Sequence, residues 1–143
     1  MPAPVAEPLE RHLLRSRDLI DSRYADELDV AALAAAAGVS PRHFSRRFRE
    51  TFGETPRQYL ISRRIERAKR LLRAGRLSVL EVCLEVGFAS PASFTNTFRA
   101  RTGSTPSRYK RRFEQDPAAR EAAERIPSCY AMAWARGRGR GSS

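Results

Sequence analysis

A pattern of aromatic, glycine and proline residues returns in the same order 50 residues further along the chain. The two copies are Phe44, Phe48, Phe52-Gly53, Thr55-Pro56 and Tyr59, then Phe94, Phe98, Thr102-Gly103, Thr105-Pro106 and Tyr109. A duplication of this kind predicts two copies of one small supersecondary unit. Each half of the 143-residue chain would be marginal as an isolated domain. We therefore expect the two copies to share a linking element.

Helix starts share one signature, in which a hydroxyl residue is followed by proline. It occurs at Ser40-Pro41, Thr55-Pro56, Ser90-Pro91 and Thr105-Pro106. The hydroxyl oxygen can accept a hydrogen bond from a free backbone N–H, and proline at the first helical position has no N–H to leave unpaired. Ser78 followed by Glu81 predicts a fifth start through a capping box.

No segment shows the sustained alternation of a strand, so the expected fold is all-α with about seven helices. The arrangement predicted is homeodomain-like and duplicated: two helix–turn–helix subdomains joined by a long central helix. A helix from about Pro8 to Tyr24 is expected to precede them. The expected parts are a flexible terminus at 1–7, a helical domain at 8–113 and a C-terminal extension at 114–143 with a basic flexible end. Within the domain we expect helix–turn–helix units at 30–53 and 78–103, a linker helix at 56–73 and a closing helix at 106–113.

Positive charge is concentrated on the repeat. The whole chain carries a net charge of +11. Residues 1–29 carry −3, residues 30–113 carry +13 and residues 114–143 carry +1. A basic surface that coincides with a duplicated helical unit favours a nucleic-acid partner.

The helix after Ser40 is expected to have two different sides. At about 100° per residue, Phe44 and Phe48 fall on one side, which we assign to the core. The second copy repeats this phase with Phe94 and Phe98. The outer sides carry Arg42, Ser45, Arg46 and Arg49 in the first copy and Ala92, Thr95, Asn96 and Arg99 in the second.

The outer residues have the chemistry of base readers. Arginine binds guanine through two hydrogen bonds, asparagine binds adenine in the same way, and alanine or threonine contacts a thymine methyl group. Recognition helices direct their N-terminal half at base edges. We expect base contacts from Arg42, Ser45, Arg46, Ala92, Thr95 and Asn96, and phosphate contacts from Ser40, Arg49, Ser90 and Arg99. Because the second set carries less charge, we expect the first unit to contribute more affinity.

Residues 29–113 resemble the DNA-binding domain of the AraC/XylS family of bacterial transcription regulators. The residues that carry the resemblance are Leu33 to Gly38, Ser40-Pro41, Phe44, Phe48, Gly53, Pro56, Tyr59, Arg64-Ile65, Ala68, Leu71-Leu72, Ser78-Val79, Val82, Val86 to Phe88, Ser90, Ser93-Phe94, Phe98, Gly103, Pro106 and Tyr109. The resemblance implies two recognition helices in consecutive major grooves of double-stranded DNA. It also implies that the six base-reading residues occupy the usual base-facing positions.

Two positions depart from the family pattern. Asn96 stands where a basic residue is frequent, and Cys83 stands where alanine is usual. The segments outside the resemblance are too short for an effector-binding domain, so we expect the short, stand-alone type, which can bind as a monomer. RNA polymerase is then expected as a protein partner. The operator, any small-molecule effector and the sign of regulation are not assigned by the sequence.

Several classes of protein are not expected. Two cysteines and two histidines at unrelated spacings predict neither a disulfide framework nor a metal site. No catalytic constellation, cofactor motif, signal peptide or apolar membrane span is present. We therefore expect a non-enzymatic protein of the bacterial cytoplasm, associated with the nucleoid.

Two alternative functions remain open. One is a basic architectural protein that binds nucleic acid without sequence preference, and the other is a protein-interaction module that docks on the transcription machinery. In the C-terminal extension, an eighth helix is expected from Asp116-Pro117 to about Arg125. The apolar stretch from Ile126 to Trp134 is expected either to pack back onto the domain or to contact a partner or ligand.

Overall fold

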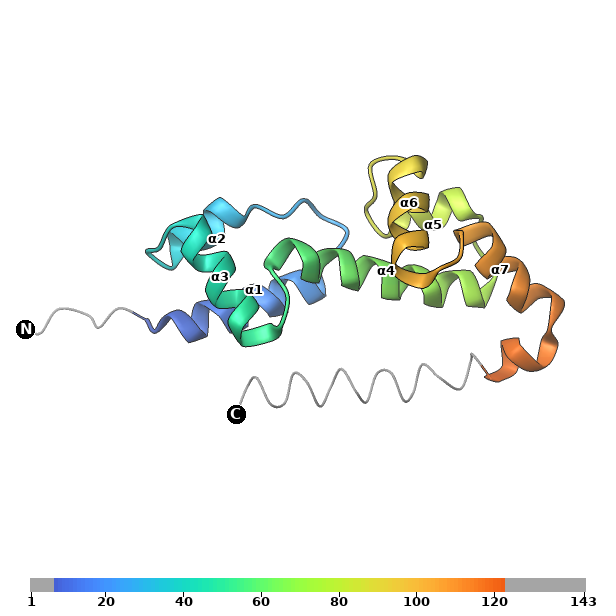
Figure 1. Cartoon of the computed structure of the whole chain (residues 1–143), viewed down its shortest axis with the longest axis horizontal. Helices are drawn as coiled ribbons and strands as arrows, with labels where there is room; N and C mark the ends of the chain where they lie inside the picture. The colour runs from blue at the N-terminus through green and yellow to red at the C-terminus, as the bar shows by residue number, and fades with distance from the viewer. Residues whose placement is uncertain (1–6, 123–143) are drawn as a thin grey trace, which may run out of the picture. The chain divides into compact units, whose positions relative to one another are not determined.

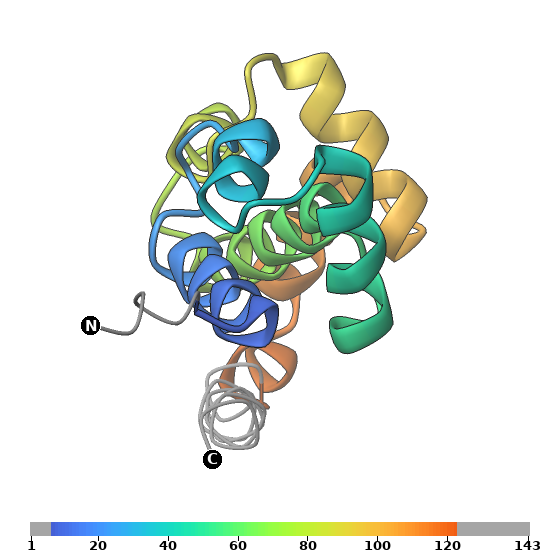
Figure 2. The ribbon, with the colours of Figure 1, turned by 90° about the vertical axis from the view of Figure 1, so that its left-hand side faces the viewer.

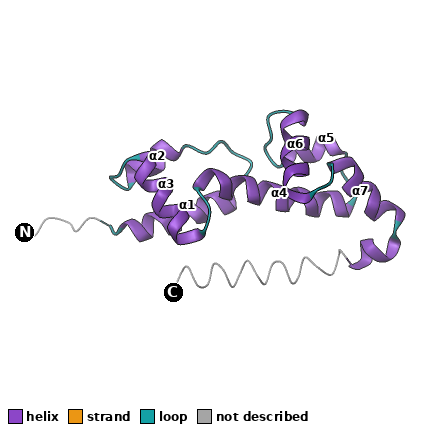
Figure 3. Cartoon of the chain, viewed as in Figure 1, coloured by secondary structure: helices purple, strands orange, loops and turns teal. Residues whose placement is uncertain are grey.

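The protein is described by a computed structural model over residues 7–122, and every regular element in that range is a helix (Figures 1 and 3). The helices are α1 (Leu9–Ser22), α2 (Val30–Ala36), α3 (Pro41–Phe52), α4 (Pro56–Ala74), α5 (Val79–Glu85), α6 (Pro91–Thr102) and α7 (Pro106–Gln115). Residues 117–122 are also helical. The expected all-α class is confirmed, and the described part of the expected eighth helix is present.

The chain divides into two compact units, Met1–Arg63 and Arg64–Ser143. In the first unit α1, α2 and α3 pack against one another, as the two perpendicular views show (Figures 1 and 2). In the second unit α5, α6 and α7 pack against one another. Helix α4 begins in the first unit and ends in the second.

The hydroxyl–proline signature begins helices where the sequence predicts them. Ser40, Ser90 and Thr105 each accept a hydrogen bond from the backbone N–H three residues further on. Thr55 forms a reciprocal pair with Gln58, with N···O distances of 3.3 Å and 3.0 Å. Ser78 and Glu81 form the predicted capping box. These side chains satisfy backbone donors that have no partner within the helix.

Glycine ends both phenylalanine-bearing helices. Gly53 follows α3 with φ of 85° and Gly103 follows α6 with φ of 81°. This left-handed conformation costs an L-residue with a side chain roughly 1–2 kcal/mol, and glycine avoids that cost. The recurrence of glycine at the same place in both copies therefore has a backbone cause.

The phenylalanines form the centre of each unit. Phe44, Phe48, Phe94 and Phe98 are all 0% exposed. Phe48 contacts Tyr59 edge to face with ring centroids 5.8 Å apart. Its counterpart Phe98 contacts Tyr109 in the same way at 5.4 Å. The assignment of the phenylalanine stripe to the core is confirmed in both copies.

Helix boundaries differ from the expectation at a few positions. Pro8 lies outside α1 as its N-cap, and Tyr24 lies in the turn beyond it. Helix α1 ends at Ser22, and an exposed ion pair of 2.9 Å joins Arg23 to Asp26 in the turn that follows. The closing helix α7 extends to Gln115 rather than stopping at residue 113.

Charged side chains fix α1 to the core of the first unit. The Asp21 carboxylate, with a side chain only 5% exposed, lies 3.0 Å from the Arg63 Nε atom. The same carboxylate accepts a 2.7 Å hydrogen bond from the Tyr59 hydroxyl. Arg17 is 8% exposed, and its guanidinium carbon lies 4.9 Å from the centre of the Phe52 ring. A buried ion pair and a cation–π contact thus join α1 to α3 and α4.

The Tyr59 environment predicts a loss of stability in alkali. Burial, followed by the hydrogen bond to Asp21, raises the pKa of Tyr59 well above its usual range. A raised pKa contributes stability that is fully present below the unfolded value of about 10 and is lost as pH rises through the folded value. We expect the free energy of unfolding to fall once the pH exceeds about 10, where the tyrosine of the unfolded chain begins to lose its proton. Denaturant titrations across this range should show a shallower fall in Tyr59→Phe, and an identical pH profile would contradict the prediction.

Candidate nucleic-acid interface

Helix α3 presents a basic surface opposite its buried phenylalanines. Arg42, Arg46 and Arg49 are exposed, and Ser45 is partly exposed beside them. The phase of the phenylalanine stripe determines this division, because residues on the other side of a helix cannot reach the core. The structure therefore brings all four predicted residues of α3 to the accessible side of the helix.

A fourth arginine of α3 is used differently. Arg47 forms ion pairs of 3.2 Å with Glu10 of α1 and 3.1 Å with Glu50 of its own helix. Across residues 7–122, no ion pair forms to Arg42, Arg46 or Arg49. These three side chains keep an uncompensated positive charge, which is what binding to a phosphate backbone requires.

Helix α6 presents the equivalent surface with less charge. Ala92, Asn96 and Arg99 are exposed, and Thr95 is partly exposed. Arg99 is the one cation among these four residues, against three in the corresponding set on α3. The predicted difference in charge between the two surfaces is therefore present in the structure.

The two cap serines begin these helices. The Ser40 hydroxyl accepts a 3.1 Å hydrogen bond from His43 N–H, and the Ser90 hydroxyl accepts one of the same length from Ser93 N–H. A serine that accepts in this way still has its own O–H to donate. Both serines are thus compatible with a second role toward an anion at the helix N-terminus.

Two exposed arginines on other helices were not assigned a role from the sequence. Arg57 lies in the first turn of α4, and Arg108 lies in the first turn of α7; both are exposed. Both follow a Thr-Pro helix start, a position where backbone N–H groups already favour anions. A basic residue two or three positions after the threonine of a Thr-Pro start is the sequence signal that could have identified them.

His43 was considered in the sequence analysis only as a metal ligand. In the structure its Nδ1 atom lies 3.0 Å from a terminal nitrogen of Arg46, one of the predicted base-facing residues. The spacing of three residues on a helix places the two side chains side by side.

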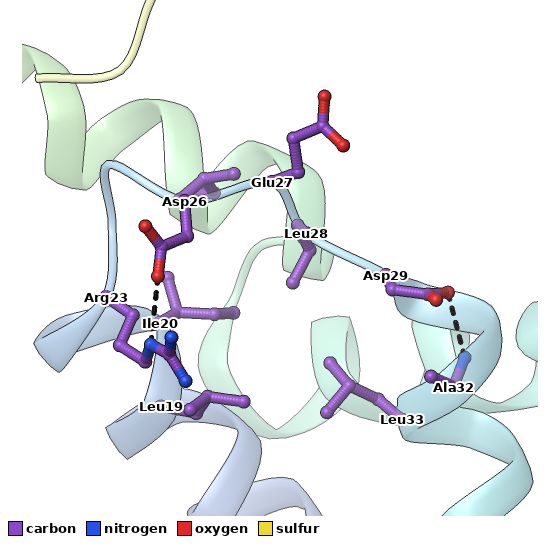
Figure 4. Close-up of a pocket in the computed structure, with 10 residues that line it drawn as sticks. Leu19, Ile20, Arg23, Asp26, Glu27, Leu28, Asp29, Ala32 and Leu33 are labelled. Carbon is purple, nitrogen blue, oxygen red and sulfur yellow. Dashed lines mark hydrogen bonds and ion pairs between the residues drawn. The ribbon is translucent and has the colours of Figure 1, made fainter.

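The first unit also contains a pocket between α1, the 23–29 segment and α2 (Figure 4). Its wall is apolar, with Leu19, Ile20, Leu28, Ala32, Leu33 and Leu60. Three carboxylates, Asp26, Glu27 and Asp29, and one cation, Arg23, complete its lining. Its excess of negative charge disfavours phosphate, so we do not include the pocket in the candidate interface.

Other site chemistry is limited within the described residues. They contain no group of three or more His, Cys, Asp or Glu side chains placed to hold a metal ion. Cys83 is buried, and burial raises the pKa of its thiol, which disfavours the reactive thiolate. This agrees with Cys83 as a core residue. Cys129 and the apolar stretch 126–134 lie outside the described residues. Among the helices described, none is long and apolar enough to cross a membrane.

Comparison with known proteins gives a consistent family. A family model described as a helix-turn-helix domain matches residues 33–112. The chain is 38% identical over 100 residues to the HTH-type transcriptional regulator GlxA of Rhizobium meliloti (strain 1021), covering 70% of this chain and 31% of that protein. The chain thus spans about a third of the length of the curated relatives it matches.

Solved structures of regulator domains are also similar to this chain. The DNA-binding domain of AdpA, a global transcriptional factor solved in complex with a target DNA, is 35% identical with a TM-score of 0.63, covering 78% of this chain and 98% of that one. The C-terminal domain of AraT, a response regulator from Geobacillus stearothermophilus, is 27% identical with a TM-score of 0.64, covering 74% of this chain and 86% of that one.

Proposed function

The chain belongs to the AraC/XylS family of transcription regulators, and from this we propose that it regulates transcription by binding double-stranded DNA at specific sequences. The observation that carries the proposal is the repeated surface of α3 and α6. Each helix begins at a serine cap, buries two phenylalanines and exposes polar side chains on the other side. The likeness to a DNA-binding domain solved with its target supports duplex DNA as the ligand.

The base-reading roles in this proposal fall on six exposed or partly exposed residues. They are Arg42, Ser45 and Arg46 of α3 and Ala92, Thr95 and Asn96 of α6. Ser40, Arg49, Ser90 and Arg99 are assigned to phosphates. We assign each helix to its own stretch of major groove, with the two stretches consecutive on the DNA. The reading units are residues 30–53 and 78–103, with α4 between them.

The function is tested by selecting bound duplexes from a random library. We expect an asymmetric site of roughly 15–20 base pairs, from two major-groove segments one helical turn apart. Affinity for the selected duplex and for a scrambled one should both fall steeply with salt, but only sequence-specific binding keeps a difference between them. Enrichment of no sequence, with binding intact, would favour an architectural protein. Capture of RNA polymerase without any duplex binding would favour a protein-interaction module.

The two reading helices are expected to contribute unequally. Arg46→Ala removes an uncompensated charge together with a base contact, whereas Asn96→Ala removes a base contact alone. Each good bidentate base contact is worth about 1–3 kcal/mol of discrimination. We expect Arg46→Ala to weaken binding of the selected duplex more than Asn96→Ala does, and to reduce the salt dependence as well. Fluorescence anisotropy at several salt concentrations measures both effects, and equal losses would contradict the asymmetry.

Partners and location complete the proposal. We propose that the chain binds DNA as a monomer, contacts RNA polymerase and acts in the bacterial cytoplasm at the nucleoid. An asymmetric selected site supports one chain per site, whereas a perfect palindrome would indicate a dimer. Light scattering of the protein–duplex complex measures the stoichiometry directly.

A further inference from the structure

We propose that His43 is a positioning residue that orients the guanidinium of Arg46 for reading a base. The two side chains lie one turn apart on α3, with Nδ1 of His43 3.0 Å from a terminal nitrogen of Arg46. This inference rests on the proposed function, because it concerns how one of the base-facing residues is held. It adds a residue that the base-facing set itself does not contain.

The direction of this hydrogen bond determines the state of the imidazole. Arginine carries only donors, so Arg46 must donate and Nδ1 of His43 must accept. A neutral imidazole with its proton on Nε2 meets that requirement. In that tautomer the ring accepts from Arg46 and adds no charge of its own.

His43 is the more buried of the two residues. It is half-buried, whereas Arg46 is exposed. A free, exposed arginine samples many rotamers, and ordering such a side chain on binding costs affinity. A hydrogen bond formed before DNA arrives reduces that cost. Because a guanidinium has five N–H donors, others remain for a base edge.

The neighbouring arginine shows why a neutral partner suits this role. Glu10 and Glu50 hold Arg47, but their carboxylates also compensate its charge. A carboxylate on Arg46 would orient the guanidinium and at the same time compete with DNA for it. An imidazole orients Arg46 and leaves its full positive charge available to the duplex.

The second repeat lacks this device. At the places equivalent to His43 and Arg46 it has Ser93 and Asn96. A short amide has fewer rotatable bonds than arginine and needs less orientation. The pairing is therefore specific to the unit whose outer surface depends on a long, flexible cation.

Two substitutions separate the hydrogen bond from the bulk of the ring. His43→Phe keeps a ring of similar size but has no acceptor. His43→Asn places an amide oxygen close to where Nδ1 lies, so it retains an acceptor. Neither change alters the backbone bond to Ser40. The thermal unfolding midpoint of each variant establishes that it is folded before binding is measured.

The probe is the duplex selected by the wild-type protein, together with the same duplex carrying each single base-pair change. Arg46→Ala identifies the base pair that Arg46 reads. At that base pair we expect His43→Phe to lose about 3- to 10-fold of discrimination, the scale set by ordering one rotamer-rich side chain. His43→Asn should keep most of it. Ser93→Ala, at the equivalent place in α6, should leave discrimination at that base pair unchanged.

A double variant tests whether His43 works through Arg46. If it does, His43→Phe should have no further effect when Arg46 is already alanine. Wild-type discrimination in His43→Phe, an equal loss in His43→Asn, or a further loss in the double variant would each overturn the inference while leaving the proposed function intact. If no duplex is enriched, or if Arg46→Ala discriminates as the wild type does, the assignment of Arg46 to a base falls, and the inference falls with it.

Discussion

Replacing Phe48 by alanine is expected to lower the free energy of unfolding by about 3–5 kcal/mol, the range for deleting a buried phenylalanine ring. Phe48 is 0% exposed and lies at the centre of the first unit's aromatic cluster. Its ring centroid is 4.6 Å from that of Phe52 and 5.8 Å from that of Tyr59. The deletion would leave a cavity that the surrounding helices can only partly close. Urea unfolding followed by circular dichroism measures the loss.

The controls lie on the same helix and in the second repeat. Arg49→Ala changes an exposed residue of α3 and should alter stability by no more than about 0.5 kcal/mol. Phe98→Ala removes the counterpart of Phe48, and its cost should fall in the same range. Amide hydrogen exchange should show the effect of Phe48→Ala mainly in α1 to α3, and that of Phe98→Ala mainly in α5 to α7. A loss below about 1 kcal/mol for Phe48→Ala would contradict its place in the core.

Asp21→Ala is expected to cost about 3–5 kcal/mol, the range for removing one partner of a buried ion pair. Asp21 lies 3.0 Å from the Arg63 Nε atom and accepts a 2.7 Å hydrogen bond from the Tyr59 hydroxyl. Its side chain is 5% exposed and that of Arg63 is 18% exposed, so the pair is largely shielded from solvent. Equilibrium unfolding in denaturant at neutral pH measures the change.

Two further variants isolate the cause. Asp21→Asn keeps an acceptor for the Tyr59 hydroxyl but removes the charge. The decrease in its free energy of unfolding relative to the wild type therefore measures the loss of the ion pair. Asp18→Ala removes another carboxylate of α1, whose side chain is 63% exposed, and should change stability little. An Asp21→Ala variant as stable as Asp18→Ala would show that α1 is not held by this ion pair.

The starts of α3 to α7 could be predicted because they depend on local chemistry. A hydroxyl at the N-cap, proline at the first position and glycine after the last act within a few residues, as Ser90, Pro91 and Gly103 do around α6. The phenylalanine stripes could be predicted equally well, because a spacing of four residues places the phenylalanines on one side of a helix. Because those stripes have the same phase in both copies, the accessible surfaces of α3 and α6 followed directly.

The polar contacts of α1 were not predicted, because they depend on residues far apart in the chain. Arg17 and Asp21 look like members of a solvated helix surface until Phe52, Tyr59 and Arg63 are placed beside them. A weaker signal was present. Leu13, Ser16, Arg17 and Ile20 follow the spacing of a single helix face, and all four are buried. Periodicity counted on apolar residues alone passes over the two polar members.

Leu71 is the opposite case, an apolar residue that is less buried than its type suggests. Leu71 and Leu72 are adjacent leucines of the linker helix, but Leu72 is fully buried and Leu71 only half-buried. Adjacent residues on a helix point about 100° apart, so both cannot face one core equally. The base-reading roles of the exposed residues on α3 and α6 stay a prediction, since they concern a ligand rather than the chain itself.

The attachment of α1 bears on how this domain can be shortened or transplanted. The match to the helix-turn-helix family begins at residue 33, beyond Leu13, Arg17 and Asp21. A graft trimmed to that match would lack the Arg17 guanidinium that lies over Phe52 and the Asp21 carboxylate that pairs with Arg63. A chimera that contains the first helix–turn–helix unit should therefore also contain α1.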